Sequence, residues 1–175
     1  MSSATATLTR PDVSTSALEP LSLRAAFAQV PQPVVIVGAE VDGAPEALVA
    51  STFTAGVSLE PPLVTFAVQH SSSTWPRLRD GATHLGVSLL GSEGGPLARQ
   101  IAGKDRTQRF AGVAYTADDD GSLVLDHAPL WLKTRVYNEF TAGDHDIVVL
   151  ELLDLGVDET VPGLVFHRSS FTPLP

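Results

Sequence analysis

A run of small hydroxyl residues before a tryptophan and a proline is the part of this sequence best suited to binding an anion. The run is Ser71-Ser-Ser-Thr-Trp-Pro76. Ser73 or Thr74 is a good N-cap for a helix that has Pro76 in its first turn. Free backbone N–H groups and the positive end of the helix dipole meet there beside the hydroxyl groups, which together favour a phosphate. Capping of a helix without any ligand explains the same residues, so this run alone leaves both interpretations open.

A second run, Leu48-Val-Ala-Ser-Thr-Phe-Thr54, combines small side chains with hydroxyl groups. Small residues let a backbone lie close to a flat ring, and the hydroxyls of Ser51 and Thr52 can hydrogen-bond the polar edge of that ring. An edge strand that exposes its hydroxyl groups to water is the alternative. This run alone therefore leaves a ring-binding segment and an exposed edge strand both open.

The common motifs of nucleotide binding and nucleophilic catalysis are absent. The sequence contains no G-x-G-x-x-G and no phosphate-binding G-x-x-x-x-G-K-[ST]. Its two Gly-Val-Ser runs do not continue into a nucleophile elbow. The absence of cysteine excludes thiolate catalysis, and the five histidines lack H-x-x-x-H spacing, so we expect no metal site. An enzyme with such a sequence needs a cofactor to carry its chemistry.

The apolar pattern predicts a mainly β fold with short helices. Helical spacing covers residues 21–30, before Pro31 and Pro33, and shorter helices are expected at about 73–81 and 96–102. A long hairpin is expected to turn at Ala142-Gly-Asp-His145. A closed or partly closed antiparallel barrel is the natural arrangement, because it removes exposed sheet edges. The expected strands and extended segments cover residues 34–37, 47–58, 63–68, 84–90, 131–139, 147–155 and, last in the chain, 164–166.

Composition narrows the classes of partner. A chain of 175 residues fits one domain, and its formal net charge of −9 argues against a surface that follows nucleic-acid phosphates. Residues 1–20 are rich in Ser, Thr, Ala and Pro and are predicted to be a disordered tail, which leaves residues 21–175 as the domain. No apolar run reaches the roughly 18 residues of a membrane span. The first residues do not form a signal peptide, so we expect a cytoplasmic protein.

Seven short motifs follow one another along the chain. Their order and spacing resemble the flavin reductase family, whose members have an FMN-binding split β-barrel. The resemblance extends from about Leu23 to Phe171. Between Phe53 and Ser58 this chain is one residue longer than is usual in that family. The motifs are Ser51-Thr-Phe-Thr, Val57-Ser-Leu-Glu-Pro-Pro-Leu-Val64, Ser72-Ser-Thr-Trp75, Gly86-Val-Ser-Leu89, Arg109-Phe-Ala-Gly112, Ala142-Gly-Asp-His145 and Phe166-His-Arg168.

The resemblance implies two sets of flavin contacts. One set would line the isoalloxazine ring and flank the ribityl chain. The other would hold the phosphate, with Arg99 as its cationic partner and Gln100 beside that arginine. A solvated helix face is the alternative for Arg99. The ring and ribityl contacts are Val49, Ala50, Ser51, Thr52, Ala67, Val68 and Gln69, and the phosphate contacts are Ser73, Thr74, Arg99 and Gln100.

The resemblance also implies how a nicotinamide nucleotide is held. His145 would face the open side of the flavin, where the nicotinamide stacks, and is the predicted catalytic residue. A turn histidine that bonds a backbone carbonyl is the alternative for His145. The remaining contacts to the nucleotide would come from Phe166, His167, Arg168 and Ser169.

The activity that the resemblance implies is hydride transfer from NADH or NADPH to FMN or FAD. Such a flavin reductase supplies reduced flavin to a partner monooxygenase. Two alternatives stay open: a flavoprotein oxidase or oxygenase that holds its flavin tightly on the same barrel, and a non-catalytic flavin-binding protein. Because split-barrel relatives bind flavin at a subunit interface, a homodimer is also expected.

Overall fold

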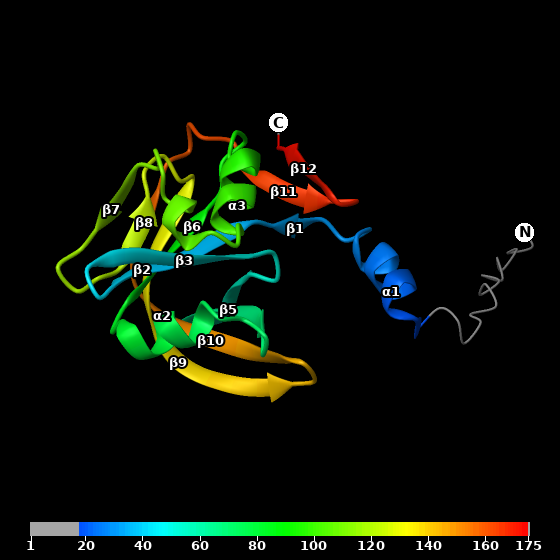
Figure 1. Cartoon of the computed structure of the whole chain (residues 1–175), viewed down its shortest axis with the longest axis horizontal. Coiled ribbons are helices and arrows are strands. Elements are labelled where there is room, and N and C mark those ends of the chain that lie inside the picture. The colour runs from blue at the N-terminus through cyan, green and yellow to red at the C-terminus, as the bar shows by residue number, and fades with distance from the viewer. Residues whose placement is uncertain (1–17, 175) are drawn as a thin grey trace, which may run out of the picture.

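Residues 18–174 are described by a computed structural model, which is mainly antiparallel β structure with short helices (Figure 1). The fold class predicted from the sequence is therefore confirmed. The predicted disordered tail falls almost entirely on residues 1–17, which lie outside the described residues, and Pro20 already begins helix α1. The helices are α1 Pro20–Phe27, α2 Trp75–Gly81, α3 Gly95–Ile101 and the 3-10 turn η2 Arg106–Gln108.

The principal sheet contains seven antiparallel strands in the order β3-β2-β6-β9-β10-β5-β4. Strand β5 alternates buried and less buried residues, as expected for a strand that covers a core with one face. The long β9–β10 hairpin turns at Gly143–Asp144, within the predicted turn. The strands are β2 Val35–Val41, β3 Ala44–Ala50, β4 Thr54–Leu59, β5 Pro62–Gln69, β6 Leu85–Leu89, β9 Leu130–Ala142 and β10 His145–Val157.

The core lies on both sides of strand β2, which is buried on both faces. Val35 and Val37 point into the barrel interior with Phe66 and Leu150. Ile36 lies on the opposite face, within a second apolar cluster that includes residues of α3. This double burial fixes the β2–β3 hairpin, because a shift by one residue would exchange the two faces.

Two small sheets complete the fold, and one of them corrects a sequence prediction. The strand predicted at 164–166 is not the last, because β12 follows it and pairs with it. The turn between them places Arg168 and Ser169 at positive φ, a conformation that glycine or asparagine usually signals. That signal is missing here, so the hairpin was not predicted. The small sheets contain β1 Gln32–Pro33, β11 Leu164–His167 and β12 Ser170–Pro173, and β7 Tyr115–Ala117 with β8 Leu123–Leu125.

The segment between Phe53 and Ser58, which we expect to be one residue longer than is usual in the family, is irregular in the structure. Pairing of β4 with β5 shifts register between Thr54 and Ser58, and Gly56 in this bulge has a φ of 70°. A bulge takes up extra length locally and bends the strand.

Gly86 in β6 lies where β8 crosses close to the principal sheet. A Cβ atom at this position would overlap the backbone carbonyl of Leu123. Because backbone cannot rotate away as a side chain can, we expect Gly86→Ala to lower the free energy of unfolding by about 3 kcal/mol. Gly163→Ala, where the nearest atom is the flexible end of Leu174, should cost less than about 1 kcal/mol. Urea unfolding of both variants measures the difference, and equal losses would contradict this packing.

Candidate active site

A hollow of about 390 Å³ opens between the ends of strands β3 and β5. His145 reaches its rim because β10 pairs with β5 and places His145 opposite Gln69. The structure thus brings together both predicted ring-contacting segments and the predicted catalytic histidine. The residues that line the hollow are Leu48, Val49, Ala50, Ser51, Thr52, Ala67, Val68, Gln69, Ser71, Ser72 and His145.

Thr52, which follows β3, is joined to β5 by hydrogen bonds of its side chain. Strand β3 is an edge of the principal sheet, so no backbone ladder joins it to β5. The Thr52 hydroxyl instead accepts a hydrogen bond from the Ala67 amide at 2.8 Å and donates one to the Ala67 carbonyl at 3.2 Å. The hydroxyl of Thr52 is therefore used within the protein. The hydroxyl of Ser51, which also lines the hollow, is the one available to a ligand.

His145 is oriented by its neighbour in the hairpin turn. Its Nδ1 lies 2.7 Å from a carboxylate oxygen of Asp144. This hydrogen bond holds the pKa of Asp144 below its ordinary value, so the carboxylate is ionised at neutral pH and can only accept. Nδ1 accordingly carries the proton, which leaves Nε2 of the exposed ring edge to interact with a ligand. A hydrogen bond from His70 likewise lowers the pKa of Asp146 at the same end of the barrel.

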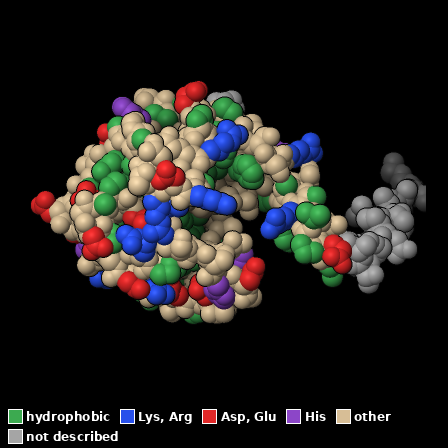
Figure 2. All heavy atoms as spheres, in the orientation of Figure 1, with side chains coloured by type: hydrophobic (Ala, Val, Ile, Leu, Met, Phe, Trp, Pro, Cys, Tyr) green, Lys and Arg blue, Asp and Glu red, His purple; other side chains and the backbone are tan. Residues whose placement is uncertain are grey.

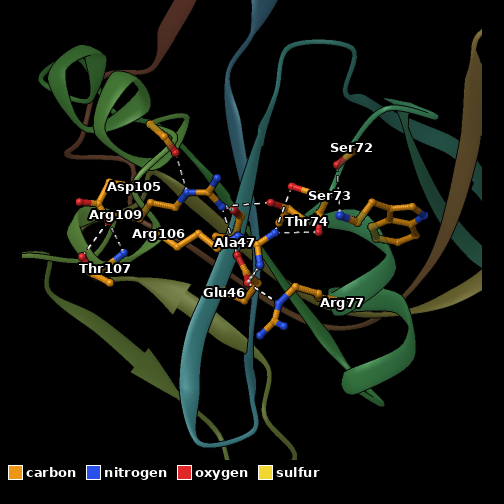
Figure 3. A network of polar contacts seen from close by, with 12 residues as sticks. Glu46, Ala47, Ser72, Ser73, Thr74, Arg77, Asp105, Arg106, Thr107 and Arg109 are labelled. Carbon is orange, nitrogen blue, oxygen red and sulfur yellow. Dashed lines mark hydrogen bonds and ion pairs between the residues drawn. The ribbon is translucent and has the colours of Figure 1, made fainter.

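Three hydroxyl residues before α2, Ser72, Ser73 and Thr74, each accept a hydrogen bond from a different partner (Figure 3). Ser72 accepts from the Trp75 amide at 3.1 Å and so caps the helix. Ser73 accepts from Arg106 through both its hydroxyl, at 3.0 Å, and its carbonyl, at 2.9 Å. The buried hydroxyl of Thr74 accepts from Arg109 at 3.0 Å. Thr74 holds the N-cap position, as predicted, but its side chain faces an arginine rather than the helix amides.

A single buried carboxylate, that of Glu46 in β3, organises three arginines around this run (Figure 3). Its Oε1 lies 3.1 Å from Arg109, and its Oε2 lies 2.8 Å from Arg77 and 3.7 Å from Arg106. The Glu46 side chain is only 7% exposed. A buried charge is tolerated only with such compensation.

Sequence reasoning did not assign a role to any residue of this cluster. Arg109 lies in the motif Arg109-Phe-Ala-Gly112 without an assigned role, and Arg77 and Arg106 belong to no motif. The available signal was Glu46 itself, the one charged residue in the strand Ala44-Pro-Glu-Ala-Leu-Val-Ala50. A lone carboxylate in a buried strand requires a cation from elsewhere in the chain.

Arg99 and Gln100 do not contact the hydroxyl run. The guanidinium of Arg99 lies 5.0 Å from the centre of the Phe171 ring, in a separate hollow beside β12. The cations that contact Ser73 and Thr74 are Arg106 and Arg109 instead. The helical pattern placed Arg99 on α3 but could not show which way that helix faces.

Gln100 has a positioning role in this structure. Its side-chain amide lies within hydrogen-bonding distance of the carbonyls of Gln108 and Arg109, each at 3.1 Å, and of Ala111, at 2.9 Å. These contacts hold the loop that supplies Arg106 and Arg109. Gln100 thus supports the cation cluster without reaching the hollow.

The predicted nicotinamide contacts lie apart from His145 within this chain. Phe166 packs against Phe171, with ring centres 5.2 Å apart. The amide of Arg168 donates to the Ala28 carbonyl at 2.7 Å, and its Nε donates to Gln29 at 3.0 Å. Strand β11 pairs with β1, so the hairpin turn at Arg168 and Ser169 lies beside the end of α1 and not beside the hollow. None of the four residues from Phe166 to Ser169 lines the hollow.

A slightly larger hollow of about 420 Å³, beside Trp131, is not lined by any of the predicted site residues. Its lysine, Lys133, is already paired with Asp118 at 3.1 Å and with Asp120. A cation neutralised in this way gives little attraction to a phosphate. The hollow between β3 and β5 is therefore the better candidate for an anionic ligand.

The chain belongs to the flavin reductase family, because residues 27–175 match the model described as a flavin reductase like domain. A flavin reductase from Pseudomonas putida is 32% identical over 157 residues, which cover 89% of this chain and 91% of that protein. An NADH:riboflavin 5′-phosphate oxidoreductase from Streptomyces pristinaespiralis is 35% identical over 171 residues, 94% of each chain. The structure of BorF, the flavin reductase component of a bacterial two-component tryptophan halogenase, superposes with a TM-score of 0.80. It is 28% identical and covers 90% of this chain and 99% of that one.

These relatives confirm the predicted family, the split-barrel fold and the class of enzyme. The roles of individual residues remain predictions. Within residues 18–174, no helix is long and apolar enough to cross a membrane.

Removal of the Glu46 carboxylate should destabilise the protein. Glu46→Ala leaves Arg109, whose side chain is 11% exposed, without its charge partner, and breaking such a pair costs about 3–5 kcal/mol. Glu151→Ala is the matched control, because it removes the partner of the half-exposed Arg135 and should cost less than about 1 kcal/mol. Urea unfolding compares the two variants. Similar small losses in both would show that the Glu46 cluster does not stabilise the fold.

Proposed function

We propose that this protein binds a flavin nucleotide in the hollow between β3 and β5 and reduces it with NADH or NADPH. The observation that supports the proposal is that three kinds of residue line one hollow. Small residues from Val49 to Ser51 suit the face of a flat ring, Ser71 and Ser72 suit polar atoms, and His145 stands at the rim. Arg106, bonded to Ser73 just beyond, supplies positive charge for a phosphate.

A bound flavin would supply the hydride acceptor, and the protein would supply the geometry. The wall formed by residues 48–52 would support one face of the ring system, leaving the other face open to a nicotinamide. Transfer between two stacked rings needs alignment and exclusion of water rather than a strong acid or base. Asp144 fixes the imidazole of His145 in one orientation, which suits a residue that positions the incoming nucleotide.

The reduced flavin would serve a separate monooxygenase. The BorF structure supports a role beside a separate enzyme, since BorF is the flavin reductase component of a two-component tryptophan halogenase. A hollow bounded on one side by the half-exposed His145 is consistent with exchange of flavin with solvent.

Steady-state oxidation of the nicotinamide tests the function directly. The purified protein, mixed with NADH or NADPH and either flavin, should remove the nicotinamide absorbance with multiple turnovers of added flavin. A protein that purifies with stoichiometric flavin and turns over without added flavin would be the oxidase or oxygenase alternative. Flavin binding without any oxidation of NADH or NADPH would indicate the non-catalytic alternative.

Replacement of His145 should impair use of the nicotinamide and spare flavin binding. Because orientation supplies several kcal/mol of a barrier, His145→Ala should lower kcat/KM for NAD(P)H at least about tenfold. The flavin dissociation constant should change less than about twofold. His70→Ala is the control, since His70 also pairs with an aspartate but does not line the hollow. Kinetics of the folded His145→Ala variant equal to those of the parent protein would exclude the positioning role.

We infer further that the protein is a homodimer. Helix α1 has no buried residue, and Leu21 and Phe27 are 81% and 65% exposed (Figure 1). The β9–β10 hairpin also exposes Tyr137 and Phe140. Two apolar surfaces on one chain suit an isologous contact between two copies. In such a dimer the predicted nicotinamide contacts of residues 166–169 would be made across the interface.

Charges introduced on α1 should dissociate this dimer. Light scattering should give twice the mass of the chain for the parent protein, and Leu21→Glu with Phe27→Glu should shift it toward a single chain. Ser22→Glu on the same helix adds charge without removing an apolar group and should leave the dimer intact. A parent protein that is monomeric at micromolar concentration would contradict the inference.

A further inference from the structure

Positive charge is concentrated on the face that carries the candidate site. Figure 2 shows Lys and Arg side chains gathered between α2 and β3, beside a hollowed part of the surface. Three guanidinium groups there share the single carboxylate of Glu46. The cluster therefore carries a surplus of positive charge on a chain whose net charge is −9. Like charges held this close favour the binding of a further anion.

Arg77 and Arg106 are the two cations of the cluster that remain accessible. Their side chains are 44% and 38% exposed, whereas that of Arg109 is 11% exposed. Both contact the same oxygen of Glu46, so their guanidinium groups lie close together. Arg77 uses its Nε for this contact, so its two terminal nitrogens are not needed to pair with Glu46. A pair of guanidiniums fixed at one end suits the geometry of a phosphate.

The pair lies beyond the end of the hollow rather than in its wall. Neither Arg77 nor Arg106 lines the hollow, whose boundary ends at Ser72. Arg106 bonds the next residue, Ser73, and its other end approaches Glu46 together with Arg77. A ligand that left the hollow past Ser73 would come to Arg106, whose partner Glu46 also holds Arg77.

We propose that Arg77 and Arg106 bind the second phosphate of FAD, so that the protein selects FAD over FMN. The proposal rests on the flavin-reductase function inferred above. FMN has one phosphate, which the hydroxyl run and the near side of Arg106 can accommodate. FAD carries a second phosphate further from the ring, where Arg77 completes the site. Glu46 contributes by holding both guanidiniums in place before the ligand arrives.

Binding measurements with FAD, FMN and riboflavin test this assignment in the full chain. Quenching of flavin fluorescence should show tighter binding of FAD than of FMN by the parent protein. Arg77→Gln should weaken FAD binding about tenfold and change FMN binding less than about twofold, because hydrogen bonds between charged groups are strong and local. Arg79→Gln is the matched control: Arg79 lies on the same helix and is 42% exposed, but it pairs with Asp80 and Glu139. It should alter neither flavin by more than about twofold.

Several outcomes would overturn the assignment. Equal weakening of FMN and FAD by Arg77→Gln would place Arg77 at the first phosphate, and no change in either would remove it from the site. A raised KM for NADPH with unchanged FAD binding would assign the arginines to the 2′-phosphate of the nicotinamide nucleotide instead. FMN binding and turnover by the parent protein without a preference for FAD would refute this proposal alone. A parent protein that binds neither flavin would refute the proposed function as well.

Discussion

Glu46 carries a negative charge into a strand of small and apolar residues, and compensation of that charge brings distant parts of the chain together. Arg109 reaches it across 63 residues of sequence and also bonds the Ala47 carbonyl and the Thr74 hydroxyl. Gln100 in turn holds the loop that carries Arg109. Since an unpaired charge at this depth would be costly, the loop, α2 and β3 must pack as one unit. The polar end of the candidate site is a consequence of that packing.

The other end of the site depends on a sheet that stops short of closing. Strands β3 and β5 approach each other without a backbone ladder, and Thr52 bridges them through its hydroxyl. Unpaired backbone beside small side chains leaves room for a flat ring, which a fully closed barrel would fill with side chains. Pairing of β10 with β5 then sets His145 at the rim of the same opening. The proposed contacts to the ring, the phosphate and the nicotinamide thus come from segments that only the barrel brings together.

Local patterns were sufficient to predict most of the fold, and the family resemblance supplied the predicted contacts of the site. Alternating apolar residues identified β5 and the β9–β10 hairpin, and the residues from Val49 to Thr52 and from Ala67 to Gln69 do line one hollow. The β11–β12 hairpin was missed because its turn uses Arg168 and Ser169 at positive φ. Arg106 was missed because its contacts are set by tertiary packing across 33 residues. The role of Arg99 as a phosphate partner was implied by the family resemblance and stays a prediction, although its guanidinium lies over the Phe171 ring in this structure.

A crystal structure of the protein with FAD would show where the flavin binds. We expect the isoalloxazine ring against residues 49–52, with His145 beside its open face and the phosphates near Ser73 and Arg106. The refined position of the ring is the measured quantity, and it does not depend on which nicotinamide nucleotide the enzyme uses. A flavin found in the hollow beside Trp131, or bound on α3 near Arg99 with the β3–β5 opening left to solvent, would contradict the proposed site.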